Sequence, residues 1–239
     1  MTKTIVIIPT YNERENISDL IKQIFKAAPE IKIMVVDDNS PDGTANDVSA
    51  LRNIYPNLML FSRFKKSGLG AAYKEALNKT LNEFPEMEII VMMDADFTHD
   101  PKDLPRLLEN TADFDMVIGS AHLTKEGMAD YSFFRALLSK WANFYCRLIF
   151  GYKLTDWTNN FLAVKTSLLK KLDLDNLDVK EFAFVFGLKF SLLRLGASWK
   201  EIPVINKIRH KGESKMKFST IKEGIVAPWR LKFQHKIKN

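Results

Sequence analysis

The chain has 239 residues, of which 46% are hydrophobic and 27% charged, so it is long enough for one sizeable core and has an ordinary globular composition. Its single cysteine, Cys146, excludes an internal disulfide framework, favours a reducing compartment and, with only four histidines, argues against a zinc site. The net charge is +6, and residues 200–239 hold 11 Lys and Arg against three Glu, so the rest of the chain is slightly acidic.

Short apolar runs alternate with amphipathic segments over the first 120 residues. The runs predict strands near residues 4–8, 31–36, 58–61, 88–93 and 116–118. The segments between them predict helices near residues 14–28, 43–54, 69–83 and 101–110. This alternation predicts an α/β fold, with a mostly parallel sheet flanked by helices on both faces.

After Gly119 the pattern loosens. Residues 132–149 predict a helix that is apolar over much of its surface, which is either buried or faces a membrane or a partner. An apolar piece, a short helix, an apolar helix and a strand follow near 160–164, 166–172, 182–195 and 199–205. We expect one domain over residues 1–217 and a basic, amphipathic helical appendage over 218–239. The appendage either lies in a membrane interface or packs back on the domain.

No stretch of about 18 consecutive apolar residues is present, so the sequence predicts no transmembrane helix. The first residues run directly into a predicted strand and lack the pattern of a signal peptide. We therefore expect a cytoplasmic protein.

The predicted strand at 88–93 delivers two carboxylates, Asp94 and Asp96, at its carboxyl end. Open α/β sheets bind their ligands at this edge. Carboxylates two residues apart in a turn can converge on one ion, and hard oxygen ligands suit Mg²⁺ or Mn²⁺, which in turn bind phosphate oxygens. The alternative is an acidic surface turn.

Other polar loops follow the neighbouring strands. Adjacent acids, Asp37 and Asp38, end the second strand, where they either accept hydrogen bonds from a nucleoside or form an exposed turn. After the third strand, Lys66 precedes Gly68 and Gly70 at the start of a helix, which suits the close approach of a pyrophosphate. All of these loops fall at the same edge of the predicted sheet.

Motifs in a characteristic order extend this pattern over roughly residues 3–217. They are Ile8-Pro-Thr-Tyr-Asn-Glu13, Val36-Asp-Asp-Asn-Ser-Pro-Asp-Gly-Thr44, Lys66-Ser-Gly-Leu-Gly70, Met93-Asp-Ala-Asp96, Gly119-Ser120, Arg135-x₃-Ser139-x₃-Asn143, Asp156-x-Thr158 and Arg209-His-Lys-Gly-Glu-Ser-Lys215. With them the chain resembles the family 2 glycosyltransferases of the GT-A (Rossmann-like) fold, and within these the dolichyl-phosphate or polyprenyl-phosphate mannosyltransferase group. The resemblance implies a metal-dependent, inverting transfer of a sugar from a nucleotide-sugar, GDP-mannose or a UDP-hexose, to a polyprenyl or dolichyl phosphate.

The resemblance also implies roles for individual residues. The nucleotide-sugar site would comprise Pro9, Tyr11, Glu13, Asp37, Asp38, Lys66, Gly68, Asp94 and Ala95. Mg²⁺ or Mn²⁺ would be held by Asp94, Asp96 and Thr98. The catalytic group, with its phosphate-binding cations, would comprise Asp96, Arg135, Ser139, Arg209 and Lys215. The implied partners are the donor, the lipid phosphate, the cytoplasmic face of a membrane and a separate membrane subunit, with no nucleic acid among them.

Four motifs depart from the family pattern, at five positions. Ala121 stands where an arginine is usual, Thr98 replaces a glutamine, Asn159-Asn160 replace Ser-Gly, and Gly187 replaces an acid. These departures weaken the assignment of mannose and GDP. They leave open a family 2 transferase with a glycan hydroxyl acceptor, which needs a catalytic base, and a non-catalytic nucleotide-sugar-binding relative.

Overall fold

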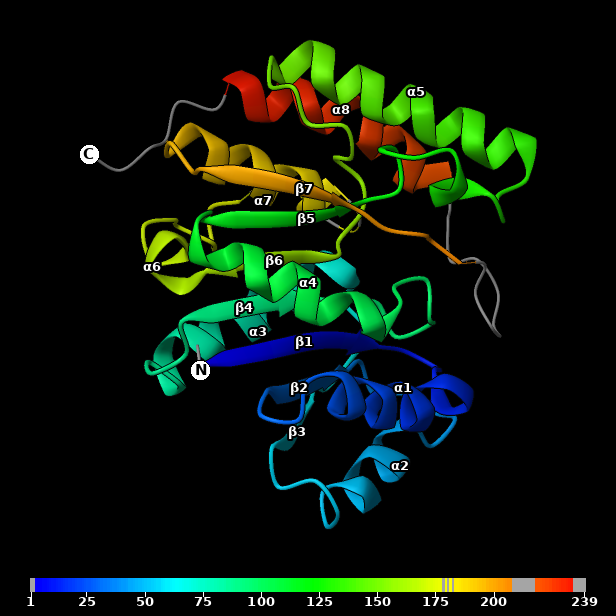
Figure 1. Cartoon of the computed structure of the whole chain (residues 1–239), viewed down its shortest axis with the longest axis vertical. Coiled ribbons are helices and arrows are strands. Elements are labelled where there is room, and N and C mark those ends of the chain that lie inside the picture. Colours follow the sequence, from blue (N-terminus) through cyan, green and yellow to red (C-terminus); the bar gives the residue numbers. More distant parts are fainter. Residues whose placement is uncertain (1–2, 178, 180, 182, 208–217, 234–239) are drawn as a thin grey trace.

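The structure is a computed structural model that describes residues 3–177, 179, 181, 183–207 and 218–233. Seven strands form one sheet in the order β3-β2-β1-β4-β6-β5-β7 (Figure 1). Every neighbouring pair is parallel except the two that involve β6, which runs antiparallel to β4 and β5. The strands are β1 (Thr4–Thr10), β2 (Lys32–Asp37), β3 (Leu58–Ser62), β4 (Ile89–Met92), β5 (Met116–Ser120), β6 (Leu162–Lys165) and β7 (Trp199–Pro203).

Helices cover both faces of the sheet, so the predicted α/β architecture is confirmed. They are α1 (Arg14–Ala27), α2 (Thr44–Leu51), α3 (Leu69–Glu83), α4 (Leu104–Glu109), α5 (Phe133–Phe150), α6 (Thr166–Leu169), α7 (Ala183–Arg194) and α8 (Phe218–Phe233), with 3₁₀ turns at Pro101–Asp103, Asn110–Ala112 and Glu126–Met128. The predicted helix at 101–110 divides into a 3₁₀ turn and α4, with prolines at the start of each. The short helix predicted at 166–172 ends at Leu169.

Each strand of the sheet divides its side chains between two cores, because successive side chains point to opposite faces. In β1, Ile5 and Ile7 face the core formed with α3, α5, α6, α7 and α8. Val6 and Ile8 face the core formed with α1, α2 and α4. All four side chains are fully buried, so the carboxyl end of β1 is fixed from both sides.

Helices α5 and α8 lie together at the opposite end of the molecule from β3 and α2 (Figure 1). The N-terminus of α5 is capped by Ser132, whose Oγ accepts a hydrogen bond from the backbone N–H of Arg135, and the helix ends at Gly151 with φ of 80°. Helix α8 contacts both α5 and α7, and its Ala227 and Leu231 are buried. The described part of the appendage therefore packs back on the domain.

Gly187 makes the contact between α7 and α8 close. A Cβ at this position would lie 3.0 Å from Val179 Cγ2 and 3.3 Å from Leu231 Cδ1. A larger side chain here would crowd Val179 and Leu231, so the glycine lets α7 lie close to α8. None of the helices in the described ranges is both long enough and apolar enough to cross a bilayer.

Candidate active site

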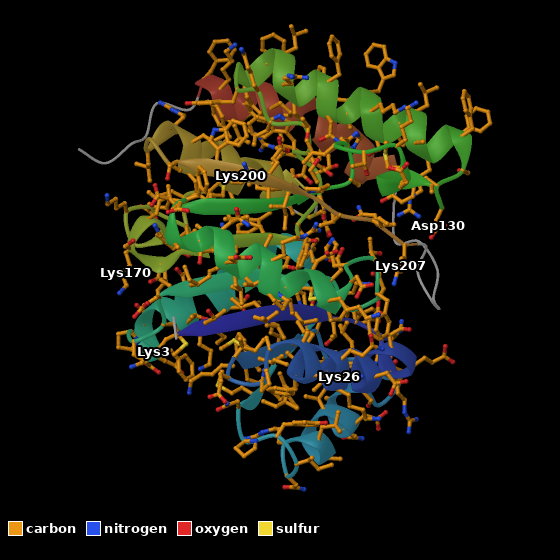
Figure 2. The ribbon with its side chains drawn as sticks, in the orientation of Figure 1. Lys3, Lys26, Asp130, Lys170, Lys200 and Lys207 are labelled. Atoms are coloured by element: carbon orange, nitrogen blue, oxygen red, sulfur yellow. The ribbon has the colours of Figure 1, made fainter. Side chains whose placement is uncertain are left out.

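The loops that follow β1, β2, β3 and β4 meet at one edge of the sheet, because these four strands are parallel. The segment after β7 joins the same edge. Lys207 Nζ donates to Asp100 Oδ2 at 2.7 Å, and Asn206 Nδ2 donates to Tyr131 Oη at 3.2 Å. Figure 2 shows Lys207 and Asp130 at this end of the molecule.

The Asp94–His99 loop follows β4 at the centre of this edge. Asp94 is half-buried, whereas Asp96 and Thr98 are 3% and 8% exposed. The backbone N–H of Thr98 donates to Asp96 Oδ1 at 3.0 Å. Phe97 has a φ of 64°, a left-handed conformation that is strained for a bulky residue. The loop thus holds two carboxylates and a hydroxyl in a turn that the local sequence does not favour.

His99 fixes the backbone of this loop. Its Nδ1 accepts a hydrogen bond from the backbone N–H of Asp94 at 3.1 Å, so the proton of the neutral ring is on Nε2. Nε2 lies 2.6 Å from Asn159 Oδ1 and donates to it. The ring also stacks on Phe161, with the ring centroids 5.1 Å apart. His99 is not among the site residues predicted from the sequence, where its only signal is its place directly after Thr98.

Asn160 holds the carboxylate of Asp94. Its Nδ2 donates to Asp94 Oδ1 at 2.9 Å and to Tyr73 Oη at 2.8 Å. The Tyr73 hydroxyl donates in turn to the carbonyl of Met93 at 3.3 Å. Burial, and then the charge of Asp94, raise the pKa of Tyr73 well above its usual value, so the hydroxyl keeps its proton. Two of the departures from the family pattern, Asn159 and Asn160, therefore form hydrogen bonds to side chains of the Asp94–His99 loop.

A buried cation supports the segment that carries these two asparagines. Lys189 of α7 is completely buried, and its Nζ donates to the carbonyl oxygens of Asp156, Trp157 and Asn159 at 2.9, 3.3 and 2.5 Å. Burial lowers the pKa of Lys189 to about 8, against the partial compensation of nearby carboxylates. A lone lysine inside an apolar helix was the only sequence signal for this support.

The two adjacent acids that end β2 and begin its loop are both buried, so the alternative of an exposed turn is wrong. Asp37 accepts hydrogen bonds from the hydroxyls of Thr10 and Ser40, and Asp38 forms an ion pair with Arg63. Arg63 also binds Glu75 Oε1 at 2.8 Å, and its side chain is 3% exposed. The repulsion between the two carboxylates is thus relieved by separate partners.

The other residues expected to bind the nucleoside lie at the end of β1 and in the loop that follows it. Pro9 is half-buried near the end of β1, and Tyr11 lies 3.7 Å beneath the Nζ of Lys66, measured to the ring centroid. Glu13 is buried, and its backbone N–H donates to Thr44 Oγ1 at 3.1 Å. The structure therefore brings Tyr11 and Lys66 together, although they lie on different loops.

The N-terminus of α3 is occupied by a carboxylate. The backbone N–H of Leu69 donates to Glu181 Oε2 at 3.4 Å. Gly68 has a φ of 91°, a conformation that favours glycine, and a Cβ here would also meet the carboxylate of Glu181. Glu181 itself has a φ of 46°. The predicted phosphate-binding turn is therefore within reach of an acidic side chain that comes from a distant loop.

Helix α5 brings polar side chains to the same edge. Ser139 Oγ and Asn143 Nδ2 lie 3.0 and 2.9 Å from His122 Nε2. The guanidinium of Arg135 stacks 4.1 Å from the ring centroid of Tyr131. Ala121, which replaces the usual arginine, is buried, and so this position offers no surface to a ligand. Arg209 and Lys215, which belong to the predicted catalytic group, lie outside the described residues.

The donor set at Asp94, Asp96 and Thr98 consists of oxygen atoms only, as Mg²⁺ and Mn²⁺ prefer. Within the described ranges there is no cluster of three or more His, Cys, Asp or Glu that would hold an ion by itself. A site with two carboxylates fits an ion that completes its coordination with water and the phosphates of a nucleotide. The residues present therefore fit such an ion as part of a nucleotide site.

Comparisons with known proteins agree with this geometry. The chain is 37% identical to the polyprenol monophosphomannose synthase of Mycolicibacterium smegmatis, over 96% of this chain and 88% of that protein. It is 35% identical to the undecaprenyl-phosphate mannosyltransferase of Micrococcus luteus, over 94% and 91% of the two chains.

Solved structures share the fold at lower identity. The glucosyl-3-phosphoglycerate synthase of Mycobacterium tuberculosis, in complex with Mn²⁺, UDP and product, has a TM-score of 0.65 at 18% identity, covering 97% of this chain and 80% of that one. The mannosyltransferase of Pyrobaculum calidifontis, in complex with GDP-Man and Mn²⁺, has a TM-score of 0.60 at 19% identity, covering 99% and 66%. The family profile of glycosyl transferase family 2 matches residues 5–173. The chain belongs to glycosyl transferase family 2, and it has the GT-A fold of a glycosyltransferase.

Proposed function

We propose that this enzyme transfers a sugar from a nucleotide-sugar to a polyprenyl phosphate at the cytoplasmic face of a membrane. The two curated relatives, by name, are a polyprenol monophosphomannose synthase and an undecaprenyl-phosphate mannosyltransferase, and both align with nearly the whole chain. Mannose carried by GDP is the first candidate for the donor, with a UDP-hexose as the alternative.

The donor would lie across the loops at the carboxyl edge of the sheet. Pro9, Tyr11, Glu13, Asp37 and Asp38 would surround the nucleoside. Lys66, Gly68 and Ala95 would contact the diphosphate. Asp94, Asp96 and Thr98 would hold Mg²⁺ or Mn²⁺, which when bound would neutralise charge on the nucleoside diphosphate.

The acceptor chemistry needs no strong base, because a phosphate monoester is already anionic at neutral pH. A phosphate oxygen of the lipid attacks the anomeric carbon and forms the new C–O bond. The bond from that carbon to the nucleoside diphosphate breaks, and the diphosphate leaves with the electron pair. In-line displacement inverts the anomeric centre. Arg135 and Ser139 of α5 would hold the acceptor phosphate, together with Arg209 and Lys215.

The observation that best supports a lipid acceptor is an apolar surface on α5 and α8. Seven large apolar side chains of α5 and four of α8 are between 45% and 80% exposed. They are Phe133, Phe134, Leu137, Leu138, Trp141, Phe144, Leu148, Ile225, Val226, Trp229 and Phe233. Monomeric proteins rarely expose so many contiguous apolar groups without a partner. We call this set the α5–α8 apolar surface.

The chemistry of this surface fits the interface of a membrane. Exposed cations accompany it on the same helices, at Lys140, Arg147 and Lys232. Aromatic rings with nearby lysines and arginines are typical of helices that lie at an anionic lipid surface. Tyr145 Oη donates to the carbonyl of Ile225 at 2.7 Å and accepts from Trp229 Nε1 at 2.9 Å, so the two helices are tied together beneath the apolar groups. A separate membrane subunit is the other proposed occupant.

The test is sugar transfer to a short polyprenyl phosphate, with Mn²⁺ or Mg²⁺ and labelled GDP-mannose, UDP-glucose, UDP-galactose or UDP-GlcNAc. Asp96→Ala is expected to abolish transfer, whereas Asp113→Ala, an exposed acid after α4, should leave it unchanged. Transfer from one donor that is lost only in the Asp96 variant would support the proposal and name the sugar. Nucleotide binding without transfer from any donor would favour a glycan acceptor or a non-catalytic relative.

A further inference from the structure

The two asparagines that replace Ser-Gly, Asn159 and Asn160, bind one loop at two points. Asn159 accepts from His99 Nε2, and the other nitrogen of that ring accepts from the backbone N–H of Asp94. Asn160 donates directly to the carboxylate of Asp94. The main chain and the side chain of Asp94 are therefore held by consecutive residues from a segment more than sixty positions away.

The orientation of both amides is fixed by their partners. Asn160 must present its NH₂ group to Asp94 Oδ1, because a carboxylate can only accept. Asn159 Oδ1 accepts from the backbone N–H of Phe161 at 3.1 Å as well as from His99, while its Nδ2 faces Asn206 Oδ1 at 3.3 Å. Both amides are buried, at 7% and 4% exposure, so water competes little for these bonds.

The support behind the amides is also buried. Tyr73 is completely buried, and its hydroxyl both accepts from Asn160 and donates to the carbonyl of Met93. Lys189 fixes the main chain through the carbonyl of Asn159. Asp156 Oδ1 accepts from the backbone N–H of Asn159 at 3.0 Å. The backbone of Asn159 and the side chain of the adjacent Asn160 are therefore both held by buried protein groups.

We infer that Asn160, backed by Tyr73, is a positioning residue that orients the Asp94 carboxylate for the divalent ion and diphosphate of the donor. This inference rests on the proposed function, because it assumes that Asp94 contacts the ion. Groups that hydrogen-bond to a metal ligand set its direction, and their loss typically lowers metal affinity by about 10- to 100-fold. The amide does not touch the ion itself; it keeps one carboxylate oxygen occupied and the group in one rotamer.

The experiment measures the affinity of the full-length enzyme for Mn²⁺ in the presence of saturating GDP or UDP, by titration calorimetry and by the electron paramagnetic resonance signal of free Mn²⁺. The variants are Asn160→Ala, Tyr73→Phe and the double variant. The control is Asn78→Ala, which removes an amide that also donates to a carboxylate, Asp175 Oδ1 at 2.9 Å, but at an exposed site. Thermal unfolding of each variant separates loss of structure from loss of positioning.

We expect Asn160→Ala to weaken Mn²⁺ binding about 10- to 100-fold and Tyr73→Phe to weaken it less. The loss in the double variant should be smaller than the product of the two single losses, because Tyr73 acts partly through Asn160 and partly through the carbonyl of Met93. Asn78→Ala should bind Mn²⁺ as the parent enzyme does. Nucleotide binding measured without Mn²⁺ should be the same in all of them.

Three results would overturn the inference. One is Mn²⁺ affinity unchanged in Asn160→Ala at a temperature where the variant is folded. Another is an equal loss in Asn78→Ala, and the third is independent, multiplying effects of the Tyr73 and Asn160 substitutions. If the parent enzyme binds neither nucleotide with Mn²⁺, the proposed function itself fails, which is a distinct result.

Discussion

The α5–α8 apolar surface predicts that vesicle binding depends on particular aromatic residues. Trp141 and Phe144 of α5 are 62% and 58% exposed. An aromatic side chain has about 150–250 Å² to bury, so these fractions leave roughly 120 Å² of each residue exposed to water. At about 25 cal/mol per Å², complete transfer of that area out of water gives ~3 kcal/mol for each residue. A helix in the interface buries only part of this area. Burial of half gives ~3 kcal/mol for the pair, or about a hundredfold in the partition coefficient.

The assay is co-sedimentation with vesicles of phosphatidylcholine and phosphatidylglycerol. The double variant Trp141→Ser/Phe144→Ser should partition about a hundredfold more weakly than the parent, with an unchanged unfolding midpoint because both side chains are exposed. Phe64→Ser is the matched control. Phe64 is 102% exposed, more than either α5 residue, but it follows β3, at the far end of the molecule from α5 (Figure 1).

Two results would refute the reasoning. The double variant could bind vesicles as tightly as the parent, in which case the apolar groups serve a protein partner or a second copy of the chain. Alternatively, Phe64→Ser could lose as much binding as the double variant. Vesicle binding would then depend on exposed apolar side chains anywhere on the surface, and not on α5 in particular.

Further predictions concern the interior. Lys189→Met should lower the free energy of unfolding by about 2 kcal/mol at pH 7. Three buried carbonyls lose their donor, and this loss outweighs the gain from no longer burying a cation. The pKa of Lys189 is about 8 in the folded protein and 10.5 in the unfolded chain, so between these values the unfolded chain binds more protons. The free energy of unfolding of the parent, measured in urea, should therefore rise relative to that of Lys189→Met from pH 8 to 10.5. Burial raises the pKa of the Cys146 thiol to about 12, so mass spectrometry should show iodoacetamide modifying it at pH 8 only after unfolding. Gly187→Val should lower the free energy of unfolding by about 1–3 kcal/mol by crowding Val179 and Leu231, whereas Gly224→Ala, with nothing within 4 Å, should be neutral or stabilising.

Local patterns in the sequence were sufficient to place the elements of the fold. Apolar runs such as Ile89–Met92 stand out against amphipathic neighbours, and the predicted strands and helices lie within a few residues of those observed. The direction of β6 was not predicted. An apolar run of four residues looks the same in either direction, and its pairing with β4 and β5 is a property of the assembled sheet.

The site was predictable where it depends on loops after parallel strands, and not where it depends on distant partners. The position of Asp94 and Asp96 at the sheet edge follows from the strand that precedes them. The partners of Asp38 and Asp94, which are Arg63 and Asn160, do not, because each pair is joined only when the chain is folded. In the sequence, Asn160 was visible only as a departure from a family motif.

The place of β6 between β4 and β5 has a consequence for the order of events during synthesis. Strands β1 to β4 can pair as soon as they have left the ribosome, since each neighbour in β3-β2-β1-β4 is already made. Strand β5 is made next, but both of its partners, β6 and β7, lie later in the chain. A nascent chain that ends before Leu162 therefore carries β4 as an open sheet edge and β5 without a neighbour, and both are sites where a chaperone would be expected to bind.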